Sequence, residues 1–527
     1  RVDDGKLLTI KNELQLLSGD LRLYGKAQMI QTHSGINTNT YAGGSLSRDQ
    51  QGTTNKFNFN YWSSPVGINN ASNYTLSAVL LDGTNPLNPQ PPQWTPGVNG
   101  SASSPITISK RWIFKYENTT SSVANWVYVS NDGNINPGLG FTMKGNDAAG
   151  SFQNYTFKGE VFNGEYTIPV APENLNLLGN PYPSAIDAYA FIDDNEDVID
   201  GTLYFWDHFE NNSTHVQHLY EGGYASLTKV GVVAAVSPTG VVGTKFPKRY
   251  LPVGQGFMVF GNETGGQIMF KNSQRIFKTE DDTDAMHLFR DEHAEISEHN
   301  YLKLQLTMTD SDAINHPILI GFMDDLADDG YNLGYDASIH KDGLNQLYVE
   351  VDQKKLNILA LGSFGEEKII PLSIDVLTSG LHEFDLEIIE HPELYNHVNY
   401  FLYDTYLNTW HDLSETKAKL NLKKDKYKHR FYLSFSKDAS LFEGEPILRD
   451  VFYANSSQQL GIQLNKKPKN TVEVKIYNIQ GQALKHFQLP ADDFNNELAV
   501  DVLLNPGVYI LKVQIDGQQH LKKFFVK

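Results

Sequence analysis

Short alternating runs of apolar and polar residues, separated by turn residues, restrict the fold of this chain more than any other feature. Clear examples are KFNFNYW, GTLYFWD and QLYVEV, in which apolar side chains recur with a period of two. No run is followed by a convincing helix of the ten or more residues that a crossover between parallel strands requires. The pattern predicts an all-β protein of antiparallel β-sandwich or jelly-roll modules and argues against an α/β enzyme scaffold.

At 527 residues, the chain is too long for one hydrophobic core and is expected to form several domains. Two linkers, at residues 278–289 and 437–450, interrupt the strand pattern. The short run SAIDAYAFI after Pro183 predicts a helix whose first turn Ser184 caps. The predicted domains are a β-sandwich half at 1–165, a second half at 166–280, a sandwich or jelly roll at 281–440, and a small Ig-like β-sandwich at 450–527.

The first 277 residues contain the same kinds of motif twice in the same order. This order indicates a diverged internal duplication, in which loop insertions explain the unequal spacings. The alternative is two unrelated β domains with similar turn residues. The first set is NYWSSPVG, RWIFKY, PGLGFTM and NYTFKG, and the second is LLGNPYPS, TLYFWD, PVGQGFMV and QIMFKN.

Composition excludes several classes of function. Without cysteine, the chain has no disulfide, thiolate nucleophile or Cys-ligated metal. Its net charge of −19 argues against a nucleic-acid partner and against anionic membrane surfaces. No apolar run approaches the ~18–20 residues of a membrane helix. Because the chain starts with Arg1, we expect it to be the C-terminal part of a longer or processed precursor whose export signal precedes this sequence.

Catalytic and metal-binding motifs give little support for an enzyme. No nucleophile elbow, zinc-protease helix, P-loop or dinucleotide fingerprint occurs, so we predict no catalytic residue and no resident cofactor. The cluster His208, His215 and His218 has no standard metal spacing, and a solvated polar loop is the simpler interpretation. The acidic stretches 193–197 and 324–330 leave calcium binding by a β loop open, although Ala327 breaks the EF-hand pattern.

Five of the six tryptophans lie in the first half of the chain. They are Trp62, Trp94, Trp112, Trp126 and Trp206. An exposed aromatic platform would fit a glycan ligand, whereas core packing is the commoner use of tryptophan in strands.

The chain ends in PGVYILKVQIDGQQHLKKFFVK, two β-rich runs around an Asp516-Gly517 turn. This pattern predicts a terminal hairpin. A two-residue loop places Tyr509 opposite Phe524, and a three-residue loop places it opposite Phe525. We favour the second register because it gathers more apolar side chains on one face.

The motifs VKIYNIQGQALK, LLNPGVYILKV and KKFFVK occur in this order at the end of the chain. Together they resemble the type A C-terminal sorting domain of the type IX secretion system of Bacteroidota. One motif differs, because the family usually opens with Tyr-Pro-Asn-Pro and this chain has YANS at residues 453–456. From residue 450 onward, nine Lys against seven Asp or Glu give +2, so the preceding residues carry −21.

The resemblance implies that the terminal domain is an export address. Its implied partners are the outer-membrane translocon barrel, a shuttle β-barrel protein and a cell-surface sortase, and the implied location is the cell surface or the medium. The lysines offer positive charge to a partner, although they could instead protect an edge strand from aggregation. The candidate contact residues are Gly507, Val508, Tyr509, Ile510, Lys512, Asp516, Gly517, Lys522, Lys523, Phe525 and Lys527.

Segments upstream resemble parts of large surface and adhesin-like proteins of gliding Bacteroidota. They include FNYWSSPVG, LLGNPYPSAID, PVGQGF and NYFLYDTYLNTWHDL. The resemblance implies adhesive or stalk-like modules that serve surface adhesion or gliding motility. The alternative is a carbohydrate-binding accessory region of a larger secreted hydrolase.

Overall fold

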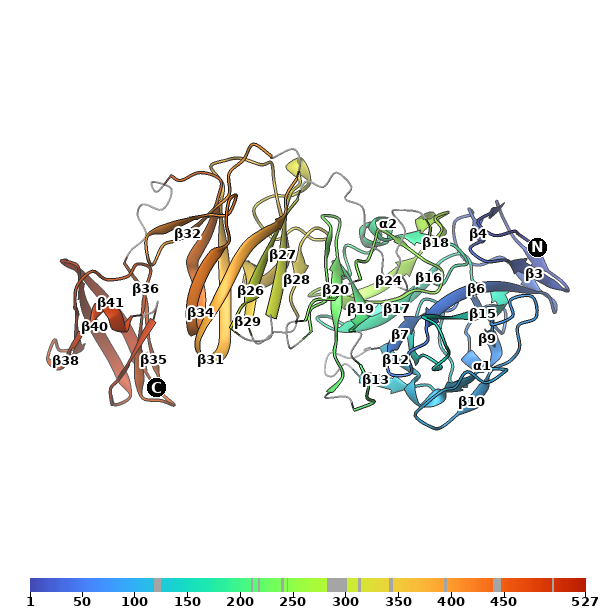
Figure 1. The fold of residues 1–527 in the computed structure, drawn as a ribbon, viewed down its shortest axis with the longest axis horizontal. Coiled ribbons are helices and arrows are strands. Elements are labelled where there is room, and N and C mark those ends of the chain that lie inside the picture. The colour runs from blue at the N-terminus through green and yellow to red at the C-terminus, as the bar shows by residue number, and fades with distance from the viewer. Residues whose placement is uncertain are drawn as a thin grey trace. The chain divides into compact units, whose positions relative to one another are not determined.

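In the computed structural model the regular secondary structure is almost entirely β-strand, which confirms the predicted all-β class (Figure 1). It describes residues 1–117, 125–209, 212–216, 219–237, 241–243, 245–281, 301–310, 314–340, 345–392, 396–438, 447–494 and 497–527. These residues form two compact units. Unit 1 comprises residues 1–301, 319–340 and 357–362, and unit 2 comprises residues 302–318, 341–356 and 363–527.

The described residues of unit 1 form short strands and two short α-helices. No helix among the described residues of the chain is long and apolar enough to cross a membrane. The first part contains β1 (Leu7–Ile10), β2 (Gln15–Leu16), β3 (Asp20–Leu23), β4 (Gln28–Gln31), β5 (Thr40–Tyr41), β6 (Ser45–Thr53), β7 (Phe59–Trp62), β8 (Val66–Gly67), α1 (Leu76–Val79), β9 (Leu80–Asp82), β10 (Gln93–Thr95), β11 (Thr107–Ser109), η1 (Lys110–Trp112), β12 (Phe114–Glu117), β13 (Asn125–Tyr128), β14 (Phe141–Lys144) and β15 (Phe152–Val161). The second part contains β16 (Tyr166–Val170), β17 (Leu175–Gly179), β18 (Ala185–Asp187), α2 (Ala188–Asp193), β19 (Ile199–His208), β20 (Gly222–Leu227), β21 (Val232–Val233), β22 (Tyr250–Leu251), β23 (Gly256–Gly261), β24 (Gly266–Phe270), η3 (Asn272–Gln274) and β25 (Arg275–Ile276).

Two five-stranded sheets form the centre of unit 1, β3-β6-β15-β8 with β9 also paired to β15, and β17-β23-β19-β20-β21. One continuous core joins strands of both sheets and buries Leu46, Trp62, Phe157 and Phe257. Most pairs are antiparallel as expected. The parallel pairs are β1 with β4, β2 with β5, β3 with β6, β10 with β11, and β27 (Ile314–Phe322) with β30 (Lys354–Leu361). These strands have at most nine residues. A loop, residues 96–106, connects β10 to β11, and other strands lie between the partners of the remaining pairs.

The two predicted motif sets pair in the same way. Trp62 of β7 lies opposite Phe141 of β14, and Leu178 of β17 lies opposite Phe257 of β23. Each set also bridges the other at matching positions, Trp62 with Gln255 and Leu178 with Leu139. The duplication remains a hypothesis, but matched and reciprocal pairing is what a duplicated module would produce.

The predicted helix after Pro183 begins later than expected. Residues 185–187 form β18, which pairs with β22 and β25, and α2 follows at 188–193. Asp187 rather than Ser184 caps the helix, because the Asp187 carboxylate accepts a hydrogen bond from the Tyr189 backbone N–H. The Ser184 hydroxyl instead accepts from Arg275 Nε at 3.0 Å. The prediction of Ser184 as the cap was therefore wrong, because the three residues after Ser184 form a strand and the helix can begin only after them.

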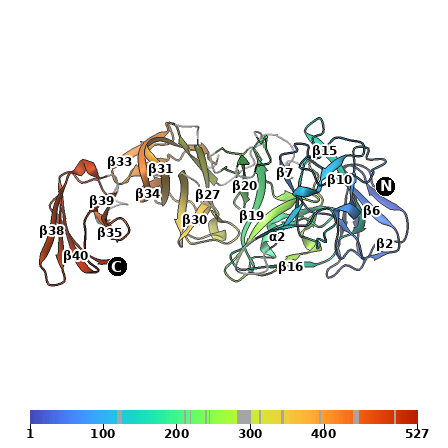
Figure 2. The same cartoon turned by 90° about the horizontal axis from the view of Figure 1, so that it is seen from below.

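Unit 2 contains two long strands, β31 and β34, paired side by side (Figures 1 and 2). The pairing of β31 with β34 has a shift in register between Val376 and Leu381. The first part of β31 also pairs with β29, and its last part pairs with β26. β28, η4 and the last residues of β27 and β30 belong to unit 1. In chain order, the elements of both units from residue 301 to residue 434 are β26 (Tyr301–Met308), β27 (Ile314–Phe322), η4 (Asp324–Leu326), β28 (Ala337–Ser338), β29 (Asn345–Val351), β30 (Lys354–Leu361), β31 (Ile369–Glu390), β32 (Phe401–Asp404), β33 (Thr409–Asp412) and β34 (Ala418–Ser434).

The terminal domain, residues 447–527, is a small sandwich of two antiparallel sheets, β35-β36-β39 and β38-β37-β40-β41. Its core buries Leu460, Ile462, Val474, Leu511 and Val513 from strands of both sheets. The elements are β35 (Leu448–Ala454), β36 (Gln459–Leu464), β37 (Val472–Asn478), β38 (Ala483–Leu489), η7 (Ala491–Asp493), β39 (Glu497–Asp501), β40 (Gly507–Ile515) and β41 (Gln518–Val526).

The hairpin β40–β41 has the two-residue loop, so the favoured three-residue register was wrong. Tyr509 lies opposite Phe524, and Ile515 lies opposite Gln518. Asp516 and Gly517 both have positive φ, 46° and 85°, as a tight two-residue hairpin turn requires. Turn geometry sets the register, and some apolar side chains are left on the outer face of the sheet as a result.

Candidate functional site

The hairpin β40–β41 presents a mixed apolar and basic surface on the outer face of the terminal sheet. Across the two strands, Val508 lies opposite Phe525, Ile510 opposite Lys523, and Lys512 opposite Leu521. Alternation along the strands places these six side chains on one face, which we call the outer hairpin face. Leu521 and Phe525 are 60% and 59% exposed, which is unusual for large apolar side chains.

Other predicted contact residues have structural places. Tyr509 is buried in the core, stacks on Phe524 at 5.6 Å, and donates its hydroxyl hydrogen to the Asn505 carbonyl at 2.7 Å. Lys522 lies opposite Leu511 on the other face, although its side chain is exposed. The structure therefore brings together only part of the predicted set.

The remaining predicted residues fix the ends of the hairpin. The Asp516 carboxylate accepts backbone hydrogen bonds from Lys469 and Asn470, both at 3.0 Å, and so ties the turn to the segment before β37. At the chain end, the Lys527 backbone N–H donates to the Asn455 side chain at 3.1 Å. Gly507 starts β40 opposite Val526. These contacts order the terminus, in agreement with its strand pattern.

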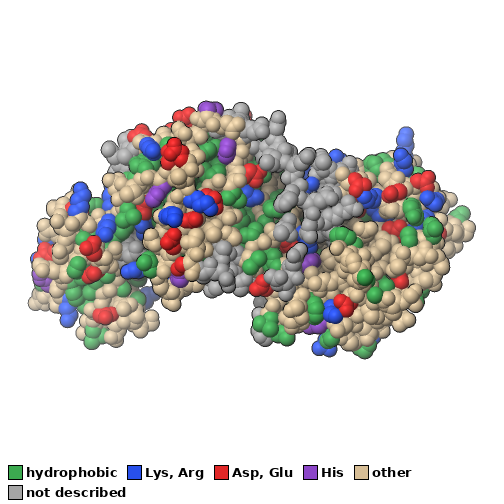
Figure 3. All heavy atoms as spheres, viewed as in Figure 1, with side chains coloured by type: hydrophobic (Ala, Val, Ile, Leu, Met, Phe, Trp, Pro, Cys, Tyr) green, Lys and Arg blue, Asp and Glu red, His purple; other side chains and the backbone are tan. Residues whose placement is uncertain are grey.

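Two residues of β37 extend the outer hairpin face and were missed from the sequence. Tyr477 lies opposite Ile510, and Lys475 lies opposite Lys512. The alternation in TVEVKIYNIQG would have placed both on the face away from Val474 and Ile476. Lys and apolar side chains are interspersed over the visible face of the terminal domain (Figure 3).

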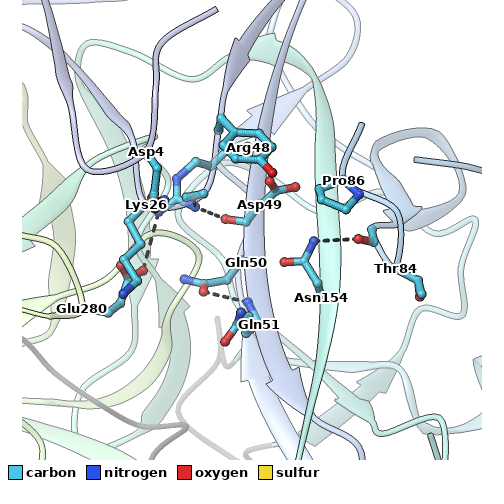
Figure 4. Close-up of a pocket in the computed structure, with 13 residues that line it drawn as sticks. Asp4, Lys26, Arg48, Asp49, Gln50, Gln51, Thr84, Pro86, Asn154 and Glu280 are labelled. Atoms are coloured by element: carbon cyan, nitrogen blue, oxygen red, sulfur yellow. Dashed lines mark hydrogen bonds and ion pairs between the residues drawn. The ribbon is translucent and has the colours of Figure 1, made fainter. Parts of the chain in front are cut away.

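A polar pocket of about 380 Å³ lies in unit 1 (Figure 4). It combines carboxylates, cations and carboxamides, so hydrogen-bond donors and acceptors alternate around it. The lining residues are Asp4, Tyr24, Gly25, Lys26, Arg48, Asp49, Gln50, Gln51, Gly83, Thr84, Pro86, Asn154 and Glu280.

Arg48 of β6 is the most buried charge of this pocket, at 2% exposure. Its Nη1 donates to the carbonyls of Gly25, at 2.5 Å, and of Asp49. Its Nη2 lies 3.5 Å from Glu280 Oε1, too far for a good hydrogen bond. Within the described part of the chain, Nε and Nη2 have no hydrogen-bond acceptor. Burial lowers the pKa of the guanidinium, and Glu280 partly offsets this. Unsatisfied donors in a polar pocket favour an added hydroxyl or water as partner.

The histidine cluster is not assembled as a metal site in the part of the chain that is described. His208 Nε2 lies 3.3 Å from Lys245 Nζ, and His215 Nδ1 lies 3.1 Å from Lys144 Nζ. His218 lies outside the described residues. Burial and the adjacent lysine lower the pKa of both His208 and His215. Within the described ranges, no three His, Asp or Glu side chains are grouped to hold a metal ion.

Carboxylates of the acidic loop after β27 hold backbone N–H groups. Asp336 accepts from the backbone of Asn332 at 2.6 Å and of Ala360 at 2.5 Å, and Asp328 accepts from Gly330 at 2.7 Å. The Asp328 bond is typical of an Asx turn, whereas Asp336 ties the loop to the backbone of Ala360 on β30. Calcium binding by this loop stays a prediction, and a fall in the thermal midpoint after addition of a chelator would be its signature.

The tryptophans of unit 1 mainly pack against other rings. Trp62 is buried in the core, and Trp206 stacks between Tyr61 at 5.8 Å and Tyr220 at 6.0 Å. Trp112 stacks on His215 and lies beside Lys144, whose pKa burial lowers to about 8. Trp126 is 41% exposed. The described tryptophans of unit 1 therefore do not form a continuous exposed platform.

Comparison with known families gives two matches. Residues 93–435 match a family described as "Domain of unknown function (DUF8693)". Residues 454–527 match the "Secretion system C-terminal sorting domain". No curated protein matches the chain. The second match covers the terminal sandwich from the end of β35 to the last residue, including the whole outer hairpin face.

Proposed function

The chain belongs to the family described as a domain of unknown function (DUF8693), ends in a type IX secretion sorting domain, and on this premise we propose how its parts divide their roles. As a type IX cargo protein, it is exported to the cell surface or released. The terminal domain acts as the address that the translocon barrel and shuttle barrel bind and that the sortase removes. The upstream β modules form the adhesive or stalk-like part presented at the surface.

The outer hairpin face is the observation that carries the address proposal. Phe525 and Leu521 offer apolar area to a partner, while Lys512 and Lys523 add positive charge beside it. Apolar contact supplies affinity, and charge complementarity favours the correct partner. Lys523 Nζ also lies 5.0 Å from the Phe525 ring centre, so charge and apolar surface form one patch.

Deletion of residues 450–527 tests the address. We expect the truncated protein to accumulate inside the outer membrane of a type IX-competent cell, and arrival at the surface would refute the proposal. A finer test reverses two charges with Lys512→Glu and Lys523→Glu, which we expect to reduce export severalfold. The matched control is Lys485→Glu, an exposed lysine on β38 at the opposite edge of the same sheet.

Glycan binding by unit 1 is the second candidate function, and the polar pocket supports it. Sugar hydroxyls both donate and accept hydrogen bonds, so they suit a wall that mixes Gln51 and Asn154 with Asp4 and Glu280. Three carboxylates in the lining disfavour an anionic ligand. The volume of about 380 Å³ lies at the lower end of small-ligand sites, which span ~300–1,000 Å³. A short neutral saccharide is therefore the ligand class we propose.

A glycan array probed with the whole chain tests this second candidate. We expect binding that Gln51→Ala and Asn154→Ala weaken, and that Gln90→Ala, outside the pocket lining, leaves unchanged. Absence of binding would favour a rigid stalk. Turnover of a bound glycan would instead support the accessory region of a secreted hydrolase.

A further inference from the structure

One side chain from outside the terminal domain lies in its core. Tyr406 belongs to the four-residue loop between β32 and β33 and is only 3% exposed. It packs in the same cluster as Leu448, Val451 and Leu460 of the terminal domain. The terminal domain therefore does not complete its core with its own residues alone.

Hydrogen bonds fix this insertion at both ends of the tyrosine. The Tyr406 hydroxyl donates to the carbonyl of Phe494 at 2.7 Å, just after η7. The Tyr406 carbonyl accepts from the backbone N–H of Lys467 at 2.6 Å. Nearby, Arg449 Nη1 donates to the carbonyl of Lys428 on β34 at 2.5 Å. Three bonds thus join elements on either side of residues 439–446 within unit 2.

Hydrogen bonds to the buried Asp404 side chain stabilise the loop that carries Tyr406. The Asp404 carboxylate accepts from the backbone N–H groups of Tyr406 at 3.0 Å and Leu407 at 3.1 Å. Arg430 donates to both oxygens of Asp404, at 3.0 and 2.8 Å, and its guanidinium lies 5.0 Å from the Tyr406 ring centre. This buried pair presents the ring in one conformation, so little side-chain entropy is lost when the terminal domain closes over it.

We infer that Tyr406 docks the sorting domain on the preceding β module, and that the domain stays bound when the chain is cut between them. The docked side consists of β35, residues 465–467 and the turn after η7. With the domain docked, Leu521 and Phe525 remain about 60% exposed, so the outer hairpin face stays available to a partner. The consequence for export rests on the proposed function, because cleavage by the sortase would then need a separate undocking step to release the domain.

Replacement of residues 439–446 by the recognition site of a sequence-specific protease tests docking on the purified full chain. After cleavage, we expect the two fragments of the wild-type background to co-elute in size-exclusion chromatography at about 10 µM. Separation of these fragments would overturn the inference. Because the readout does not involve export, it is independent of the deletion test in cells.

Variants at Tyr406 establish its role in holding the fragments. Tyr406→Ala should separate them, and Tyr406→Phe, which loses the bond to the Phe494 carbonyl, should weaken their affinity about fivefold. The control is Tyr348→Ala, a buried tyrosine of β29 whose hydroxyl bonds Asp375 within the upstream module. If Tyr406→Ala fragments co-elute as the wild type does, Tyr406 is not the docking residue. If Tyr406→Ala does not fold, the co-elution of the wild-type fragments and the affinity of the Tyr406→Phe fragments still test the docking.

Discussion

At the scale of single residues, His316 of β27 is a buried titratable group with no role in the candidate sites. It is 8% exposed, and its Nε2 has no hydrogen-bond partner among the residues that the structure describes. Burial lowers the pKa of His316 to about 4 from the usual 6.5. Between pH 6.5 and 4 the unfolded chain therefore binds a proton that the folded chain does not, so stability falls as the pH falls through this range.

Replacement of His316 by leucine should remove this dependence. Since one pKa unit corresponds to about 1.4 kcal/mol, the wild type should lose about 2 kcal/mol between pH 6.5 and 5 through this residue. His316→Leu should lose correspondingly less, as measured by denaturant unfolding at both pH values. An unchanged pH dependence in the variant would mean that other groups account for the loss.

At the scale of elements, the turn of the terminal hairpin determines which residues the outer face presents. Apolar side chains on one face favoured the three-residue loop, and the observed loop has two residues. The positive φ of Asp516 and Gly517 decides the register, because it matches the twist of a tight hairpin. The Asp516 carboxylate then accepts hydrogen bonds from the backbone N–H groups of Lys469 and Asn470, in the segment before β37.

Gly517→Ala should destabilise the terminal domain by about 1 kcal/mol. A Cβ at this position meets no atom within 4 Å, so the cost comes only from the left-handed backbone conformation. Asp516→Ala should cost about 1–2 kcal/mol, because the hydrogen bonds to the backbone of 469 and 470 are also lost. Thermal unfolding measures both, with Gln519→Ala as a near-neutral control. Equal stability of Gly517→Ala and wild type would contradict the turn assignment.

The strand β31 is longer than its local sequence pattern predicts. The run HEFDLEII alone predicts a strand of ordinary length, and Ser379-Gly380 before it looks like a break. The structure has a single strand of 22 residues, since a register shift between Val376 and Leu381 absorbs the irregularity. Gly380 adopts φ 112° there, which only glycine tolerates without strain.

In the molecule as a whole, the folding of each motif set of unit 1 depends on the other set. The backbone N–H of Ser63 donates to the Gly254 carbonyl at 2.7 Å, and that of Gly179 donates to the Gly138 carbonyl at 2.9 Å. Gly138 and Gly254 also share a positive φ, 83° and 72°. Each half therefore completes the strands of the other, and neither is expected to fold alone.

Expression of residues 1–165 and 166–281 tests this dependence. We expect neither fragment to unfold cooperatively alone, and a mixture of the two to regain the transition of intact 1–281. The buried Arg275 would contribute, since its Nη1 bonds Asn163 at 3.1 Å across the boundary. A cooperative thermal transition of 1–165 by itself would show that the halves are independent.

The all-β class, many of the longer strands and the type IX sorting domain could be predicted from the sequence, because two-residue alternation and ordered motifs are local signals. The sequence also identified the terminal hairpin and its lysines. The tertiary structure decided the hairpin register, the burial of Tyr509, the addition of Lys475 and Tyr477 to the outer hairpin face, and the insertion of Tyr406. The burial of Tyr509, the pairing of β37 with β40 and the insertion of Tyr406 depend on contacts between residues distant in sequence, whereas alternation shows only which side chains of one strand share a face. The register depends on the dihedral angles of the Asp516-Gly517 turn, which outweigh the apolar pattern.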